Sequence, residues 1–527
     1  MSKNRPLAIS ALVASAVAAG GVAAAPAMAA DSGDSASTNT VGTNAAPQLG
    51  RIGGVDRYAT AIGASKADFP VDGSAQGVVI ARGDIYVDAL AGTPLAAKTG
   101  SSLLLTDSKQ LTPGVADEIK RLLGTGTAAK AKTITILGGE VAVTPAVEIQ
   151  LKALGYTVKR IGGFDRFATA LDIAGTTKAK NAIVATGMNF ADALSAGPLA
   201  AASQDAAIVL SNDSIVTDAA TAAFIKGAGT VTSVGMPAVN AVDKLGVKDA
   251  ELAGVDRYQT AAAVATQSIL KDSKTAVVAG GLIFSDPLVG GVYAAHNHGA
   301  LLLTNPSYLS PSTAAALVGF TTPLRQVTIF GGLQAVSQGV QNTISSVLNG
   351  GYSLYIGQLK DAVAKAQTAV DAAQQAYDAA VAAPGTALAA FDTAVQKSTD
   401  KAVTDAEQAL FDAAKVSTDA KVQAAYDAYA KALAANPGPA IGTALANARW
   451  SLESAITATT DTAVKQAVTT LDAKVAATTD PAVTAAEAAV TKAVQDNPSA
   501  VKAATDKLAA AQAALAQAQK ALADALA

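Results

Sequence analysis

An internal repeat is the feature that most constrains the fold of this chain. The segment Arg-Ile-Gly-Gly-Val-Asp-Arg-Tyr-Ala-Thr-Ala at 51–61 recurs with small changes at 160–170 and, in a more divergent form, at 252–261. The aspartates of the three copies are 109 and 91 residues apart. A period of this size corresponds to a small domain rather than to one turn of a solenoid. We therefore expect three related domains within residues 50–350.

Each copy continues with further matching segments in a constant order. An aromatic-x-Asp segment is followed by an apolar run and then by a strand-like segment ending in glycine. The third copy diverges most, with Leu252-Ala253-Gly254 in place of Arg-Ile-Gly-Gly and Pro287 in place of alanine, and the second has Gly235-Met236 where the others have two glycines. The matching segments are 86–97, 190–201 and 284–295; 103–106, 208–211 and 301–304; and 136–143, 233–239 and 329–336.

The hydrophobic pattern of each copy alternates short apolar runs with longer helical segments. Val78–Ala81, Leu103–Leu105 and Ile134–Leu137, for example, precede helical patterns from about Asp88, at 112–123 and at 144–154. Apolar strands without polar alternation are buried on both faces, which is typical of a parallel sheet covered by helices. The fold class is therefore α/β, with three tandem Rossmann-like repeats. The expected boundaries are 50–155, 156–248 and 249–355.

The two ends of the chain differ from the repeats. Lys3 and Arg5, the apolar run that follows, and Ala-Met-Ala at 27–29 indicate a signal peptide over 1–29, too short for a membrane span and followed by a disordered leader at 30–49. Residues 356–527 are rich in Ala and almost devoid of Gly, which favours a helical bundle or coiled coil. Several antiparallel helices are expected there rather than one rod. The proline sites expected to interrupt them are at 384–385, 436–439, 480–481 and 497–498.

Composition excludes several classes of function. A net charge of −3 without a dense basic cluster argues against a nucleic-acid partner, and the absence of cysteine removes thiolate chemistry. No phosphate-binding or dinucleotide glycine loop occurs, so no cofactor is expected. His296 and His298 are the two histidines; they lack a third ligand nearby, so no metal site is assigned. No catalytic residues are singled out, and we expect a protein that is not an enzyme.

The repeated polar residues allow a structural and a functional interpretation. Asp56, Asp165 and Asp256 precede helical runs, where a carboxylate can cap the helix. Asp88, Asp192 and Asp286 are interpreted in the same way, with a contact to a sugar hydroxyl or a weak cation site as the alternatives. The motif arginines can pair at domain junctions, or can grip an anionic polymer with two parallel hydrogen bonds each. The motif threonines are assigned a structural part. These arginines and threonines are Arg57, Arg166, Arg257, Thr60, Thr169 and Thr260.

Taken together, these motifs closely resemble the bacterial cell wall binding repeat 2 family over about residues 50–350. The resemblance implies a Rossmann-like fold for each repeat, a pseudo-threefold arrangement of the three, and noncovalent anchoring to anionic polymers of a Gram-positive wall. It also implies that the motif arginines and the apolar triplets serve binding, although the triplets read from their residues alone are buried strands. The triplets are Leu103, Leu104 and Leu105; Ile208, Val209 and Leu210; and Leu301, Leu302 and Leu303.

The helical region at 356–527 has three possible uses at this point. It is a spacer, a self-associating bundle, or a segment that binds a protein partner. For the whole chain, two other functions remain open beside anchoring: a wall-anchored glycosidase or amidase that remodels peptidoglycan, and a secreted adhesin.

Overall fold

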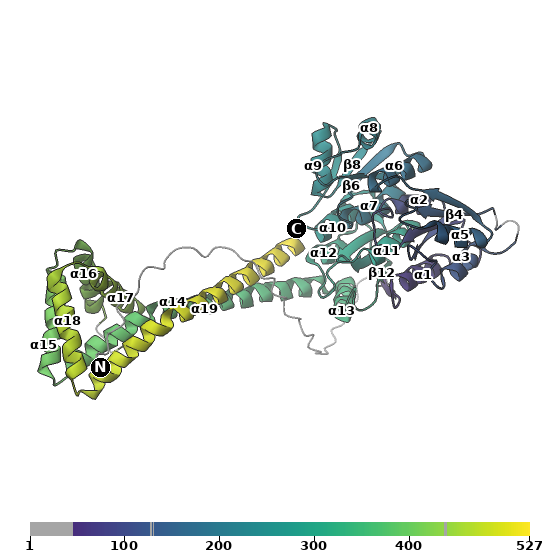
Figure 1. The fold of residues 1–527 in the computed structure, drawn as a ribbon. Helices are drawn as coiled ribbons and strands as arrows, with labels where there is room; N and C mark the ends of the chain where they lie inside the picture. The colour runs from purple at the N-terminus through teal and green to yellow at the C-terminus, as the bar shows by residue number, and fades with distance from the viewer. Residues whose placement is uncertain (1–45, 127–128, 130, 437–439, 527) are drawn as a thin grey trace. The chain divides into compact units, whose positions relative to one another are not determined.

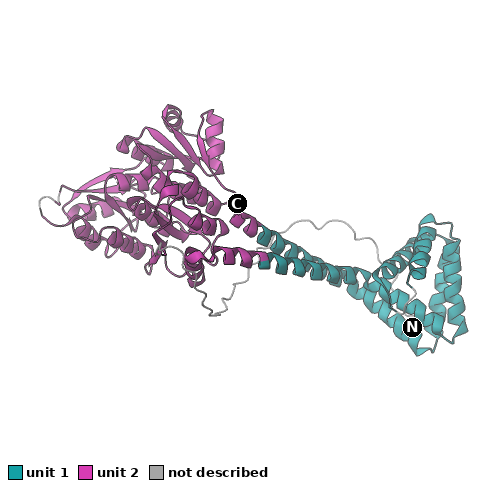
Figure 2. Ribbon diagram, turned by 180° about the vertical axis from the view of Figure 1, so that it is seen from behind, with its two compact units in different colours: residues 1–25, 361–519 teal, residues 26–360, 520–527 magenta. Residues whose placement is uncertain are grey.

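A computed structural model describes residues 46–126, 129, 131–436 and 440–526, which form two compact units (Figures 1 and 2). We call residues 46–360 with 520–526 the repeat body and residues 361–519 the helical unit. The predicted signal peptide lies outside the described residues, as does the predicted leader up to residue 45. The leader prediction is wrong for its last two residues, which belong to a strand beginning at Gln48.

The repeat body contains three parallel four-stranded sheets, which confirms the predicted α/β class. In each sheet a strand formed by an apolar run lies at one edge, and the strand that enters the next Asp-Arg motif lies at the other. The sheets are, in spatial order, β3(Ser101–Thr106)-β2(Gly77–Arg82)-β4(Thr133–Leu137)-β5(Thr157–Ile161), β7(Ala206–Ser211)-β6(Asn181–Thr186)-β8(Val231–Val234)-β9(Ala250–Leu252), and β11(Ala300–Thr304)-β10(Thr275–Gly280)-β12(Gln326–Phe330)-β1(Gln48–Ile52).

Neighbouring repeats are joined by these edge strands. β5 precedes the second motif but pairs with β4 of the first repeat, and β9 pairs in the same way with β8. β1, at the other end of the sequence, pairs with β12, so that Ile52 lies opposite Phe330. The three repeats therefore form a closed circle, and its sheets cross the boundaries that the motifs suggest at 155 and 248.

Three helices, one from each repeat, pack against one another in the middle of this circle (Figure 1). We call them the axial helices; they are α2(Gly92–Lys98), α7(Ala191–Ala202) and α11(Ser285–His296). Their sequences are rich in Ala and Gly, and a Cβ on Gly197 would lie 2.9 Å from the side chain of Thr93. Small residues thus allow the close approach of the axial helices.

The other helices of the repeat body cover the sheets. Each Asp-Arg motif begins one helix, and two further helices follow the remaining strands in each repeat. They are α1(Arg57–Asp68), α6(Arg166–Thr177) and α10(Arg257–Gln267); α3(Val115–Leu123), α8(Ala219–Gly227) and α12(Pro311–Gly319); and α5(Pro145–Ala153), α9(Met236–Leu245) and α13(Gln338–Ser346).

The helical unit contains several packed helices, as predicted. α15 packs on α18 and α16 on α17. No helix within the described ranges is both long and apolar enough to cross a bilayer. The helices of this region are α14(Tyr352–Lys397), α15(Lys401–Lys415), α16(Ala420–Ala434), α17(Thr443–Ala458), α18(Thr462–Ala477) and α19(Pro481–Leu526).

The predicted helix breaks at two of the proline sites are wrong. α14 continues through Pro384, and α19 continues through Pro498. Pro384 cannot donate to the carbonyl of Ala380 four residues earlier. The side chain of Asn497, on α19, donates to that carbonyl instead, at 2.8 Å. The break at 480–481 is confirmed, whereas residues 437–439 lie outside the described part of the chain.

A buried polar network lies in the core of the helical unit. Arg449 donates from Nε to Asp392 Oδ2 at 2.7 Å, and Tyr429 Oη donates to the same oxygen at 2.7 Å. Glu407, also buried, lies beside them, and its pKa is raised by burial and by the charge of Asp392. Glu407 therefore keeps its proton to a higher pH than an exposed glutamate does.

Candidate functional site

The Asp-Arg motif positions its residues by capping a helix, as predicted. Asp56 accepts a hydrogen bond from the backbone N–H of Ala59 at 2.8 Å, and Asp165 accepts one from Ala168 at 2.8 Å. Asp256 caps α10 in the same way. The residue after each cap is the motif arginine, so the first turn of α1, α6 and α10 fixes the position of the arginine backbone.

The second set of aspartates does not cap helices, so that prediction is wrong. Phe190 and Phe284 occupy the N-cap positions of α7 and α11, which places Asp192 and Asp286 inside the first turn. From there the carboxylates reach a neighbouring repeat. Thr169 Oγ1 donates to Asp88 at 2.9 Å, and the matching pairs are Thr260 with Asp192 and Thr60 with Asp286.

These three Asp-Thr pairs join all three repeats in a circle. Burial raises the pKa of each aspartate, and it raises the pKa of Asp192 to about 6. The sequence did not reveal these pairs, because each one joins residues far apart in the chain.

A glycine at the end of β4, β8 and β12 makes room for each buried carboxylate. Gly138, Gly235 and Gly331 have φ angles of +94°, +85° and +106°. A Cβ at these positions would lie 2.7, 2.1 and 2.5 Å from an oxygen of Asp88, Asp192 and Asp286. The second repeat, with methionine in place of the second glycine, therefore keeps the glycine that the site requires.

The motif arginines lie half-buried at the carboxyl ends of the sheets. Nη1 of Arg166 donates to the carbonyl of Gly187 at 2.6 Å, and Nη1 of Arg257 donates to that of Gly281 at 2.6 Å. Arg57 makes the equivalent bond to Gly83. Each guanidinium also acts on the buried aspartate of the neighbouring repeat and lowers its pKa, against the larger effect of burial. The hydrogen bonds of these arginines therefore lie within one repeat, whereas their charge acts across the boundary to the next.

An aromatic side chain from each repeat meets the other two at the N-terminal ends of the axial helices. The ring centroids of Tyr86 and Phe190 are 5.6 Å apart, those of Tyr86 and Phe284 are 5.7 Å apart, and those of Phe190 and Phe284 are 6.3 Å apart. Arg57 lies over Phe284 at 5.7 Å and Arg257 over Phe190 at 5.4 Å. Equivalent residues of three repeats therefore converge on one pseudo-threefold axis.

We call the three motif arginines and these three aromatic residues the axial cluster. A guanidinium has five N–H donors, and in the described residues the hydrogen bonds of these arginines run from Nη1. The remaining donors suit an anion, because arginine forms a planar fork that matches carboxylate and phosphate groups. Around the cluster, the residue before each motif aspartate is an exposed apolar side chain: Val55 is 99% exposed, Phe164 89% and Val255 74%.

The apolar triplets are the interiors of β3, β7 and β11. All nine side chains are at most 2% exposed. They support the strands that carry the site and do not reach a surface from which they could contact a polymer. Two other arginines, missed in the sequence, are also structural: Arg51 donates to the carbonyls of Gly331 and Val336 at 2.7 and 2.9 Å, and Arg160 makes equivalent bonds within the first sheet.

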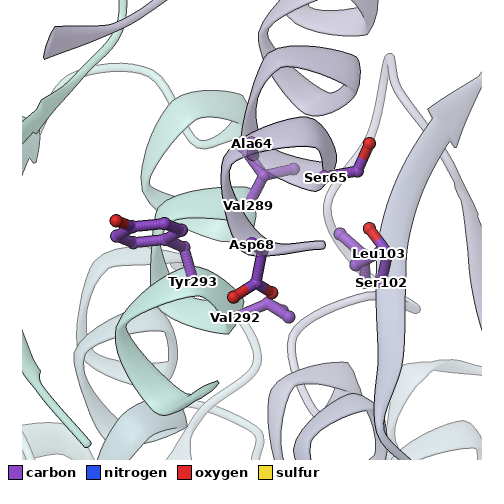
Figure 3. A pocket seen from close by; sticks show the side chains of 8 residues that line it. All are labelled: Ala64, Ser65, Asp68, Ser102, Leu103, Val289, Val292 and Tyr293. Atoms are coloured by element: carbon purple, nitrogen blue, oxygen red, sulfur yellow. The ribbon is translucent and has the colours of Figure 1, made fainter. Parts of the chain in front are cut away.

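A small cavity lies between α1 and α11, beside Asp68 (Figure 3). Its volume is about 10 Å³, and Ser65, Ser102 and Tyr293 are among the side chains that line it. This volume corresponds to about one water molecule. The cavity is therefore not a site for an organic ligand.

Comparison with known proteins shows the family of the repeats. The model of the family described as "Cell wall binding domain 2 (CWB2)" matches residues 51–148, 160–240 and 251–341. The structure of Cwp8 from Clostridium difficile superimposes with a TM-score of 0.51 and 29% identity, over 57% of this chain and 52% of that one. Cwp6 from the same organism gives 0.52 and 25%, over 60% and 50%.

Two curated relatives come from Bacillus subtilis (strain 168). N-acetylmuramoyl-L-alanine amidase LytC is 30% identical over 306 residues, which is 57% of this chain and 58% of that protein. Amidase enhancer is 28% identical over 296 residues, or 56% and 40%. The chain thus matches about half of the length of these relatives. The binding repeats also locate the protein at the cell surface.

Proposed function

Because the chain belongs to the cell wall binding domain 2 family, we propose that its repeat body anchors the protein noncovalently to a Gram-positive wall by binding an anionic wall polymer at the axial cluster. The observation that carries this proposal is the convergence of aromatic rings from all three repeats on one axis, with the motif arginines of two repeats lying over these rings. A repeating polymer presents its charges at intervals. Three weak contacts on one rigid body then act together and raise the avidity.

The geometry also indicates how the arginines are prepared for an anion. A backbone carbonyl holds each guanidinium in place, and an aromatic ring also lies against those of Arg57 and Arg257, which reduces the loss of side-chain entropy on binding. The buried aspartate of the neighbouring repeat lies near each arginine and partly offsets its charge. Binding through these arginines is therefore expected to weaken as salt is added, because exposed charges are screened.

Binding of the full chain to purified walls tests the proposal. Replacing Arg57, Arg166 and Arg257 together by glutamine should lower the affinity at least about a hundredfold, since all three contacts are lost. A matched control replaces three exposed lysines, Lys109, Lys226 and Lys271, by glutamine and removes the same charge from the same body. Undiminished binding by a folded triple arginine variant would refute the role of the axial cluster. Walls stripped of anionic polymers should bind neither the natural chain nor the lysine control.

The proposal includes a helical unit that acts as a spacer or an interaction region and not as a catalyst. The Ala-rich composition and the packed helices of this unit support it. One relative is named as an amidase and another as an amidase enhancer, which makes wall remodelling the alternative. Zymography on peptidoglycan decides between them: clearing by the purified chain would overturn the non-enzymatic assignment.

A further inference from the structure

A hollow of about 440 Å³ lies at the other end of the axial helices from the aromatic rings. The C-terminal ends of α2, α7 and α11 line it, together with the turn that follows α7. It opens to solvent, since Lys98, Ala202 and His298 on its wall are exposed. No residue of the axial cluster lines it, so any ligand of the hollow is separate from the proposed wall polymer.

The electrostatics of the hollow favour a positive group. The C-terminal end of a helix carries a partial negative charge, and cations are stabilised there. Three such ends meet at this hollow. The side chain of Asp205 adds a carboxylate, which is 38% exposed and 3.6 Å from the ammonium of Lys98.

The repeats supply their own basic group at two of the three ends. Lys98, Ala202 and His296 hold equivalent positions in the last turns of the axial helices. Lys98 Nζ donates to the carbonyl of Thr177, the last residue of α6, at 2.6 Å. His296 Nδ1 bonds to Asp68, the last residue of α1. Alanine stands at the third position, so the C-terminal end of α7 has no basic residue in its last turn.

The residues that line the hollow indicate what kind of cation would fit there. Pro94, Ala97, Ala201 and Ala295 offer small apolar surfaces, whereas Asp205 offers a carboxylate. A short alkyl chain that ends in an ammonium matches both, because such a side chain buries its methylenes and keeps its charge among polar groups.

We propose that this hollow binds a primary ammonium carried on a short alkyl stem, such as the lysine-type side chain of a peptide. The ligand supplies the positive charge that alanine at position 202 leaves out of the last turn of α7. Anchoring at the axial cluster and peptide binding at this hollow then use opposite ends of the same three helices, and either can fail without the other.

The two histidines of the chain are convenient reporters, because both line the hollow. Nα-acetyl-lysine methylamide is titrated into the full-length protein labelled at histidine, and the imidazole resonances are followed by NMR. Saturable shifts are expected with this probe and not with its Nε-acetylated analogue, which keeps the stem but has no charge. Absence of shifts up to about 50 mM probe, or equal shifts with both compounds, overturns the proposal.

Three variants test the assigned position. Ala202→Lys places a tethered ammonium at the end of α7 and should weaken probe binding at least about tenfold, whereas Ala202→Gln, of similar length without charge, should bind within about threefold of the natural chain. Asp205→Asn removes the carboxylate and should also weaken binding; asparagine tolerates the positive φ of +48° found there. Equal affinity of the lysine and glutamine variants would overturn the proposal, and circular dichroism verifies that each variant is folded.

Discussion

The buried carboxylate of Asp192 makes the stability of the repeat body depend on pH in a way that can be measured. Burial raises the pKa of Asp192 to about 6, against the effects of Arg257 and Thr260, which lower it. Its ordinary value in an unfolded chain is close to 3.8. Asp192→Asn keeps the shape and one acceptor oxygen, but it cannot ionise. Comparison of the two proteins therefore isolates the free energy of this ionisation.

The sign and size of the effect follow from proton linkage. Between pH 3.8 and pH 6 the unfolded chain has released the proton of Asp192 while the folded protein still holds it. Stability therefore falls as the pH rises through this window and levels off above it. A shift of about two pKa units corresponds to about 3 kcal/mol. The natural chain should lose about this much more stability than Asp192→Asn between pH 3.5 and pH 7.

Urea unfolding of both proteins across this pH range, followed by circular dichroism, measures the difference. Trp450 lies in the helical unit, and its fluorescence gives an internal control that the substitution should leave unchanged. Asp218→Asn is the matched control. This aspartate is a helix cap whose pKa is lowered by hydrogen bonds from Thr221, so its pH dependence has the opposite sign. Parallel stability profiles for the natural chain and Asp192→Asn would refute the reasoning.

Three further predictions follow from the contacts. Gly235→Ala should destabilise the repeat body by about 3 kcal/mol or more in urea unfolding, because the φ of +85° and the nearby carboxylate of Asp192 both oppose a Cβ, whereas Gly175→Ala, in a helix with open space around it, should be neutral or stabilising. Phe284→Ala should cost about 3 to 5 kcal/mol and lower wall affinity, since it removes the ring under Arg57; unchanged wall binding by the folded variant would contradict the axial cluster. Glu407→Gln should gain stability relative to the natural protein, and this gain should be larger at pH 8 than at pH 5, as judged by Trp450 fluorescence in urea. The reason is that the raised pKa of Glu407 makes the natural protein less stable as the pH rises above 4.5, the ordinary pKa of glutamate.

The sequence predicts those parts of the fold that depend on local pattern. Continuous apolar runs such as Leu103–Leu105 identify buried parallel strands, and an aspartate directly before a helical run, such as Asp56, identifies a helix cap. The pairs that join the repeats depend instead on residues far apart in the chain. Nothing near Asp88 indicates that its partner is Thr169, 81 residues away, so its position before a helix suggests a cap.

Only part of the candidate site could be predicted from the sequence, because its residues also come together from distant parts of the chain. The three arginines are visible as a repeated residue, but their convergence with Tyr86, Phe190 and Phe284 requires the closed circle of repeats. In the helical unit, Pro384 predicts a break by its own chemistry. The break is avoided because Asn497, more than a hundred residues later, replaces the missing donor.

The pairing of β1 with β12 closes the circle of repeats by joining the first strand of the repeat body to its last. Strand β1 is the first strand of the repeat body to be synthesised, yet its partner at Gln326–Phe330 follows only after almost the whole repeat region. Arg57 and Phe284 come together across the same junction. Deleting a single repeat would therefore not leave two thirds of a binding module. It would leave an unpaired sheet edge and a gap in the axial cluster, so we expect the three repeats to fold as one unit.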